Sequence, residues 1–168
     1  MIEGAGIDRD ATLRLDNQLC FAVYALSREI TKRYQPHLKK LGLTYTQYIT
    51  MLVLWEQDEV TVKQLGARLQ LDSGTLTPLL KKLEAMGNII RTRDKNDERS
   101  VVITLTEQGK RLKEDAYEIP LRTFCEAGLT METANALRLH IEGIVSNLQP
   151  VSIDNNEHSK EEIQDDDL

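Results

Sequence analysis

The sequence predicts a mainly α-helical protein with one small β-hairpin, in the element order of a winged helix-turn-helix. Apolar residues recur at steps of three and four positions through most of the chain, which indicates amphipathic helices. The spacing changes to two only in "NIIRT" and "SVVITLT", segments rich in Ile, Val and Thr that are typical of β-strands. The charged stretch "RDKNDER" between them predicts the tip of a hairpin.

The first long helix is expected from Leu15, with Asp16 as its N-cap and with Pro36 and Gly42 setting its end. Residues 1–12 before it contain glycine and polar side chains, and we expect a loose arm there. The expected buried face of the helix consists of Leu19, Val23, Leu26, Ile30 and Tyr34.

The next two helices each begin with the capping-box pattern T-x-x-Q, at Thr44 and at Thr61. A further helix is predicted in "LDSGTLTPLLKKLEAMG", capped at Asp72 or Ser73 and ended by Gly87. Pro78 is disfavoured inside a helix, so we expect either a late start or a bend there. After the hairpin, one helix is interrupted at Pro120 and a last helix starts near Met131.

These patterns divide the chain into a flexible arm (1–12), a helical region (13–43 and 106–149), a winged helix-turn-helix region (44–105) and an acidic, disordered tail (150–168). The 168 residues are 40% apolar and 29% charged, as in an ordinary soluble domain. The start lacks the pattern of a signal peptide, and no apolar run is long enough to span a membrane. We therefore expect a cytoplasmic protein with reduced thiols and no membrane partner.

The motifs and the charge distribution also indicate which kinds of function to expect. We find no metal-ligand spacing, no phosphate-binding loop and no nucleophile motif, so we expect no metal, no cofactor and no enzyme activity. The net charge of −6 resides entirely in residues 151–168, which hold seven acids and one lysine, so residues 1–150 are neutral. Within that body, residues 73–99 hold six basic and four acidic residues.

This modest basic excess lies on the predicted helix-turn-helix and hairpin. A helix with hydroxyl and ammonium groups on its polar face fits a major groove, and an arginine on a thin hairpin fits a minor groove. The same pattern occurs in helical hairpins that never touch DNA, so charge alone leaves both alternatives open. The residues expected at a DNA interface are Ser73, Gly74, Thr75, Thr77, Pro78, Lys81, Lys82, Arg91, Arg93, Lys95, Asp97 and Arg99.

The stretch "LDSGTLTPLLKKLEAMGNIIRTRDKNDERSVVITLTEQG" resembles the MarR family of bacterial regulators, and "DERSVVITLTEQG" is similar to that family's wing motif. The segment "NQLCFAVYALSREITKRYQPHLKKLGLTYTQY" resembles its organic-hydroperoxide-sensing, OhrR-type branch. The resemblance implies an intertwined homodimer whose helical regions 13–43 and 106–149 mediate dimerisation. It also implies a recognition helix over residues 73–86, with Arg99 as the wing arginine in the minor groove.

The same resemblance assigns Cys20 as the reactive cysteine, with Tyr34 and Tyr45 hydrogen-bonding it or lining a peroxide pocket and Tyr24 nearby. A free cysteine on an amphipathic helix is otherwise more often a buried core residue. A cysteine near the positive end of a helix favours the reactive thiolate, although a capping Asp16 would oppose this. We interpret Cys20 as redox-sensing. Cys125 is either a resolving cysteine or a passive one, and "LRTFCEAG" around it carries no motif.

We therefore expect a dimeric repressor that binds a near-palindromic double-stranded operator and releases it when an organic hydroperoxide oxidises Cys20 to a sulfenic acid. A low-molecular-weight thiol is a possible partner that forms a mixed disulfide with Cys20. The alternatives are a MarR-type repressor switched by a non-covalent phenolic or lipophilic ligand, or a broader redox-responsive global regulator.

Overall fold

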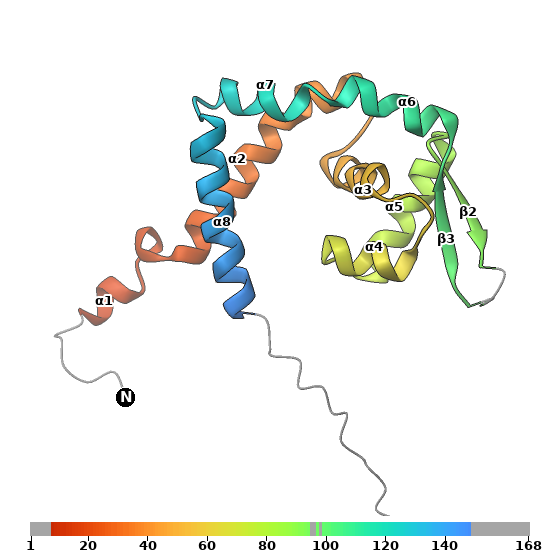
Figure 1. The fold of residues 1–168 in the computed structure, drawn as a ribbon. Helices are drawn as coiled ribbons and strands as arrows, with labels where there is room; N and C mark the ends of the chain where they lie inside the picture. Colours follow the sequence, from red (N-terminus) through yellow and green to blue (C-terminus); the bar gives the residue numbers. More distant parts are fainter. Residues whose placement is uncertain (1–7, 95–96, 98, 149–168) are drawn as a thin grey trace, which may run out of the picture. The chain divides into compact units, whose positions relative to one another are not determined.

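The computed structural model describes residues 8–94, 97 and 99–148 of the 168-residue chain. Their order and connection are shown in Figure 1. The fold divides into two compact units after Leu129. Its elements are α1 (Arg9–Thr12), a 3₁₀ helix η1 (Leu15–Asn17), α2 (Leu19–Lys40), α3 (Tyr45–Glu56), β1 (Val60–Thr61), α4 (Val62–Leu69), α5 (Ser73–Ala85), β2 (Ile89–Arg93), β3 (Val101–Leu105), α6 (Glu107–Ala116), α7 (Ile119–Glu126) and α8 (Met131–Leu148).

The first long helix begins four residues later than expected, because Gln18 rather than Asp16 is the N-cap of α2. Asp16 lies in η1, outside the helix. From residue 8 onward, the segment before α2 is folded into α1 and η1 and is not a loose arm. The amide of Gln18 donates to the carbonyl oxygens of Thr12 and Arg14 at 2.7 and 3.0 Å, and Asn17 donates to that of Ala11 at 2.7 Å.

Pro36 does not end α2, although proline disfavours a helix interior and was expected to help set the end of this helix. The helix continues to Lys40, because Pro36 is exposed and water can hydrate the carbonyl that lacks its usual donor. Gly42, at a φ of 70°, ends the helix instead. Pro78 is similarly tolerated inside α5, which begins at Ser73, so the expected late start is wrong.

Both capping boxes are confirmed. Thr44 accepts from the N–H of Gln47, whose side chain accepts in turn from the N–H of Thr44, and Thr61 and Gln64 make the same pair of bonds. Asp72 caps α5, and Gly87, at a φ of 75°, ends that helix as expected. Local side-chain hydrogen bonds thus fix where three helices begin: α3, α4 and α5.

The hairpin is confirmed, and a third strand joins it. Strands β2 and β3 pair antiparallel, with Ile89 opposite Leu105 and Arg93 opposite Val101. The short strand β1 pairs with the other edge of β3, giving the order β1-β3-β2. The sequence analysis missed β1, because two residues show no period and their partner lies far along the chain.

The core lies beneath α3, α4, α5 and the sheet. The predicted stripe of α5 is buried, with Leu76 and Leu83 fully inaccessible. The large apolar side chains that are almost completely buried are Leu38, Tyr48, Met51, Leu54, Leu65, Leu76, Leu80, Leu83, Ile89 and Ile103. This one cluster holds the helix-turn-helix and the base of the hairpin together.

The expected buried face of α2 is only half buried within the chain. Tyr34 is buried, whereas the N-terminal residues of that face, Leu19, Val23 and Leu26, are exposed. Helix α8, in the second unit, contains no buried residue, and Leu139, Ile144 and Leu148 are exposed. Exposed apolar surfaces of this extent are typical of interaction sites.

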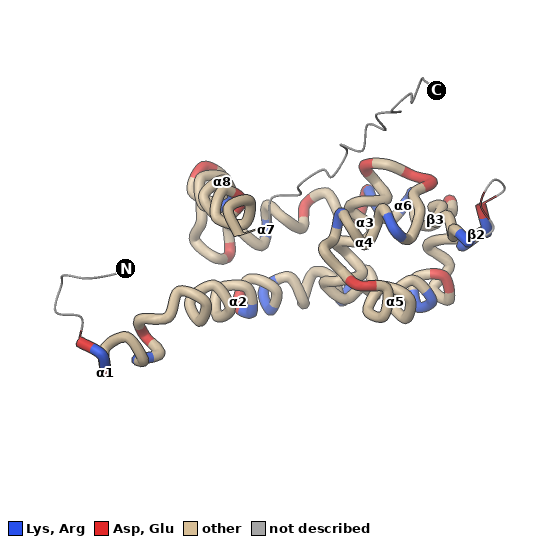
Figure 2. The backbone as a smooth tube through the Cα atoms, turned by 90° about the horizontal axis from the view of Figure 1, so that it is seen from below, with Lys and Arg blue, Asp and Glu red and all other residues tan. Residues whose placement is uncertain are grey.

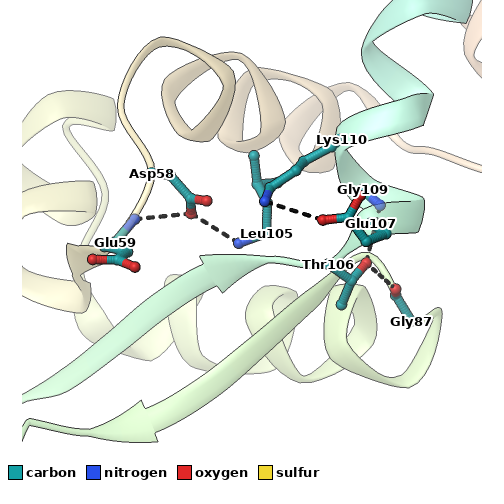
Figure 3. Close-up of polar contacts among 8 residues, drawn as sticks. All are labelled: Asp58, Glu59, Gly87, Leu105, Thr106, Glu107, Gly109 and Lys110. Carbon is teal, nitrogen blue, oxygen red and sulfur yellow. Dashed lines mark hydrogen bonds and ion pairs between the residues drawn. The ribbon is translucent and has the colours of Figure 1, made fainter.

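The base of the hairpin is fixed by a small polar network, drawn in Figure 3. The Thr106 hydroxyl donates to the carbonyl oxygen of Gly87 at 2.6 Å and accepts from the N–H of Gly109 at 3.0 Å. Helix α6 therefore starts against the end of α5. Gly109 is required there, because a Cβ would lie 2.1 Å from the carbonyl oxygen of Asn88.

Candidate DNA-binding surface and thiol site

Helix α5 presents a continuous polar face opposite its buried leucines. All the α5 residues expected at a DNA interface are exposed: Ser73, Gly74, Thr75, Thr77, Pro78, Lys81 and Lys82. Figure 2 shows basic residues on α5 and on β2, the two elements that carry the predicted surface. The helix thus offers two ammonium groups to an anionic backbone and several hydroxyl oxygens to a groove.

The hydroxyl groups of Thr75 and Thr77 are not free donors, although the sequence led us to expect donors on this face. Thr75 donates to Oδ2 of Asp72 at 2.9 Å, and Thr77 donates to the carbonyl oxygen of Ser73 at 2.7 Å. Hydrogen bonds from the backbone and side chain of Thr75 lower the pKa of Asp72, which keeps this cap ionised. Both threonines therefore present only acceptor lone pairs to a ligand.

Arg91 has a structural partner that the sequence analysis did not identify. Its Nε donates to Oε2 of Glu84 at 2.8 Å, and its backbone N–H donates to Oε1 at 3.2 Å. The Arg91 side chain is only 27% exposed. Arg91 thus joins β2 to α5 and sets the angle of the hairpin, rather than projecting from it.

The tip of the hairpin carries the exposed arginines. Arg93 ends β2, and Arg99 follows the turn; both are exposed. Oδ1 of Asp97 accepts from the N–H of Arg99 at 3.0 Å, and its carbonyl oxygen accepts from the N–H of Ser100 at 2.9 Å. Asp97 therefore shapes the turn that presents Arg99. Lys95, also expected here, lies outside the described residues.

Cys20 is the second residue of α2 and is exposed. With Asp16 outside the helix, the first turn of α2 contains no acidic residue. The N–H groups of this first turn lack intrahelical acceptors, and the helix dipole is positive at this end. Asp16 does not cap the helix, contrary to the expectation from the sequence.

Tyr34 and Tyr45 do not lie near Cys20 of the same chain. Tyr34 is fourteen residues further along the uninterrupted helix α2, which separates the two by about 21 Å at 1.5 Å per residue. Tyr45 packs edge to face on Tyr34, with ring centroids 5.4 Å apart and an angle of 66° between the ring planes. Within one chain these phenols therefore do not contact the thiol.

The tyrosine cluster of Tyr34, Tyr45 and Tyr48 is electrostatically distinctive. Burial, followed by the neighbouring Tyr48 and Tyr45, raises the pKa of Tyr34 to about 12. Burial and then Tyr45 raise the pKa of Tyr48 to about 12, and burial raises the pKa of Tyr45. These phenols stay protonated and keep their ability to donate hydrogen bonds over the whole physiological range.

Tyr24 is one helical turn from Cys20 and has a partner of its own. Nη1 of Arg28 donates to the Tyr24 hydroxyl oxygen at 3.0 Å, and the Arg28 guanidinium carbon lies 5.5 Å from the centroid of the ring. The sequence analysis missed Arg28. The signal that could have found it is the four-residue spacing, which places both side chains on one helical face.

Cys125 lies in the last turn of α7 and is exposed. It therefore lies at the carbonyl end of its helix. Oε2 of Glu126 lies 3.3 Å from Nε2 of His37 on α2, which helps to hold the two helices together. The two cysteines thus lie at opposite helix ends, Cys20 at the start of α2 and Cys125 at the end of α7.

Open grooves on the first unit include the following two. One, of about 430 Å³, is lined by both acidic and basic side chains, among them Lys40, Asp115 and Arg122. The other, of about 200 Å³, is more apolar and includes Tyr48, Trp55 and Lys113. In the part of the chain that the structure describes, no group of three or more His, Cys, Asp or Glu side chains is placed to hold a metal ion. Nor do the described helices include one that is long and apolar enough to cross a membrane.

A helix pair α4–α5 followed by the β2–β3 hairpin defines a winged helix-turn-helix protein. Residues 32–116 match the family model of the transcriptional regulators SarA/Rot. The organic hydroperoxide resistance transcriptional regulator of Bacillus subtilis is 57% identical over 108 residues, which cover 64% of this chain and 74% of that protein. SarZ of Staphylococcus aureus is 44% identical over 132 residues, covering 79% of this chain and 89% of SarZ.

Among solved structures, reduced AbfR bound to DNA superposes with a TM-score of 0.69 at 36% identity, covering 83% of this chain and 97% of AbfR; AbfR is a protein of Staphylococcus epidermidis. The chain belongs to the MarR/SarA family of transcriptional regulators, in the branch that includes the organic hydroperoxide resistance regulator. The family and fold expected from the sequence are confirmed.

Proposed function

We propose that this regulator is a dimeric repressor that binds a near-palindromic operator when reduced and releases it after an organic hydroperoxide oxidises Cys20. The observation that carries the proposal is the position of Cys20, exposed in an acid-free first turn of α2. The likeness to the Bacillus subtilis organic hydroperoxide resistance regulator supports the signal, and the likeness to DNA-bound AbfR supports the target.

The chemistry at Cys20 is a two-electron oxidation. The thiolate attacks the terminal oxygen of the hydroperoxide, the O–O bond breaks, and the alkoxide leaves and takes a proton to become an alcohol. The sulfur becomes a sulfenic acid. A low-molecular-weight thiol then attacks this sulfur, releasing water and leaving a mixed disulfide on Cys20.

The tyrosine cluster acts on the thiol of the other subunit. Because about 21 Å separates Tyr34 from Cys20 along α2, only a second copy can bring these groups together. The exposed apolar rows on α2 and α8 are the surfaces through which regions 13–43 and 106–149 form the homodimer. Protonated phenols of the partner subunit then donate to the Cys20 thiolate and line an apolar pocket for the organic group.

Cys125 is not needed as a resolving residue. It lies in the last turn of α7, at the negative end of the helix dipole, and its surroundings carry no motif of a resolving cysteine. Capping of oxidised Cys20 by a small thiol is therefore the favoured route, and Cys125 is passive.

On DNA, each subunit places α5 in a major groove and the tip of its hairpin in the adjacent minor groove. Lys81, Lys82 and Arg93 contact phosphates, and Arg99 enters the minor groove. Two-fold symmetry places the half-sites about one helical turn, or about 10 bp, apart. Oxidation alters the dimer contacts around Cys20 and changes the distance between the two α5 helices.

Fluorescence anisotropy with the palindrome upstream of the protein's own gene tests this proposal. Reduced wild type and Cys20→Ser are compared before and after one equivalent of cumene hydroperoxide per subunit, with a small thiol present. We expect wild type to release the DNA and Cys20→Ser to stay bound, with Cys125→Ser behaving as wild type. If wild type also stays bound, the cysteine is not the sensor, and a non-covalent lipophilic ligand becomes the better hypothesis.

A further inference from the structure

Three side chains follow one another at four-residue steps on the exposed face of α2: Cys20, Tyr24 and Arg28. Residues at this spacing are neighbours on a helix surface. The contact between the last two is explicit, since Nη1 of Arg28 lies 3.0 Å from the hydroxyl oxygen of Tyr24 and its guanidinium carbon lies 5.5 Å from the ring centroid. A cation is thus held against the phenol nearest in sequence to the thiol.

Arg28 differs from several other arginines of this chain in its partner. Arg68, Arg91 and Arg122 each contact a glutamate carboxylate, which neutralises their charge. Among the residues that the structure describes, no carboxylate pairs with Arg28, although Glu29 is its neighbour in sequence. The contact that the structure gives the Arg28 guanidinium is therefore with the phenol of Tyr24.

This arrangement fixes the role of the phenol. A tyrosine hydroxyl has one hydrogen and accepts through its oxygen. Because Arg28 donates to that oxygen, the Tyr24 hydrogen is left for another acceptor, and the adjacent cation makes the O–H a stronger donor. Side chains on a helix lean towards its N-terminus, which directs the Tyr24 hydroxyl to the side where Cys20 lies.

We propose that Arg28 is a positioning residue that holds Tyr24 as a hydrogen-bond donor to the Cys20 sulfur and so accelerates its oxidation by organic hydroperoxides. This inference rests on the proposed function and adds an in-chain element to it. The cross-subunit phenols and the helix end supply the rest of the stabilisation. Tyr24 transfers no proton: its O–H stabilises the thiolate that attacks, and the hydrogen bond is lost when the sulfur is oxidised.

The test measures the rate of Cys20 oxidation by cumene hydroperoxide in the full-length reduced protein, followed by trapping of the sulfenic acid. We expect Arg28→Gln and Tyr24→Phe each to slow oxidation about tenfold, and the double variant to be no slower than either single one, because both remove one coupled interaction. Arg28→Lys retains a charged donor and recovers part of the rate. Lys32→Gln, which removes a charge one turn further on, stays at the wild-type rate.

A second readout separates this role from a structural one. The pH profile for alkylation of Cys20 moves to higher pH in Arg28→Gln and Tyr24→Phe, while affinity of the reduced protein for the operator stays at the wild-type value. If Arg28→Gln slows oxidation equally in the Tyr24→Phe background, the arginine acts through its charge alone and the inference is overturned.

Different outcomes distinguish failure of this inference from failure of the proposed function. If wild type reacts and releases the operator, and Arg28→Gln does so at the same rate, only the inference is wrong. If wild-type Cys20 does not react with the hydroperoxide, the proposed function itself fails, and the Arg28 proposal falls with it.

Discussion

Oδ1 of Asp58 accepts a hydrogen bond from the backbone N–H of Leu105 at 2.8 Å, joining the loop before β1 to the last residue of β3 (Figure 3). The same oxygen accepts from the N–H of Glu59 at 2.8 Å. Since β3 is the central strand of the sheet, this carboxylate fixes the hairpin at its base, opposite the end that carries Arg99.

Replacing Asp58 tests that contact. Asp58→Ala leaves the N–H of Leu105 without an acceptor, so the free energy of unfolding falls by about 1–3 kcal/mol. Urea unfolding followed by circular dichroism measures the change. Asp58→Asn keeps a carbonyl acceptor and retains most of the stability. Equal losses in both variants would show that the ionic charge, rather than the hydrogen bond, matters.

Glu59 has a left-handed backbone, with a φ of 59°. A side chain in this conformation costs about 1–2 kcal/mol, part of which glycine recovers. We therefore expect Glu59→Gly to raise the free energy of unfolding by up to about 1 kcal/mol in urea titration. Glu59→Ala retains the Cβ and gives no such gain; a comparable gain would assign the effect to the carboxylate.

Alkaline pH provides a test of the buried phenols. Burial in the fold raises the pKa values of Tyr34 and Tyr48 from the ordinary 10.0 to about 12. The folded state thus retains protons that the unfolded chain has lost, so stability is fully present below pH 10.0 and falls as the pH rises towards about 12. Urea midpoints measured across this window show the loss. Tyr48→Phe has a shallower decline, and an identical decline would remove Tyr48 as a cause.

Arg91 and Arg99 should separate stability from DNA binding. Arg91→Ala removes the contact with Glu84 and lowers the free energy of unfolding by about 1 kcal/mol. Arg99→Ala leaves stability unchanged within about 0.5 kcal/mol but weakens operator binding and reduces the salt slope by about one. Unfolding and salt-dependent anisotropy are measured on both. Unchanged affinity of Arg99→Ala would exclude it from the interface.

Mixed dimers test the cross-subunit site. A heterodimer of a Cys20→Ser chain with a Tyr34→Phe chain keeps one intact pairing, because the remaining cysteine meets a wild-type Tyr34. A heterodimer of wild type with the Cys20→Ser, Tyr34→Phe double variant keeps none. We expect faster oxidation of the remaining Cys20 in the first, measured by sulfenic-acid trapping. Equal rates would contradict the pairing across subunits.

Features encoded by local contacts could be predicted from the sequence. Each T-x-x-Q box joins side chains three residues apart, and Gly87 ends α5 through its own φ. The start of α2 could not be placed in this way, because Asn17 and Gln18 bond to carbonyl groups up to six residues upstream. Strand β1 depends on a partner more than forty residues away, opposite Ile103.

The candidate site shows the same division. The exposed face of α5 could be predicted from the spacing of its leucines. The ion pair between Arg91 and Glu84 could not, because it depends on how the hairpin folds back onto α5. The separation of Cys20 from Tyr34 could be predicted from the helix rise alone, because the first long helix was already expected to run through Tyr34.

The inward hydrogen bonds of Thr75 and Thr77 limit what these side chains could recognise if α5 enters a major groove as proposed. With their hydrogens committed, both hydroxyls offer lone pairs only. In a major groove, adenine N6 and cytosine N4 carry amino hydrogens that match such acceptors, whereas O6 and N7 of guanine repel them. We therefore expect these threonines to favour amino-bearing bases and the neighbouring lysines to recognise any guanine in the half-site.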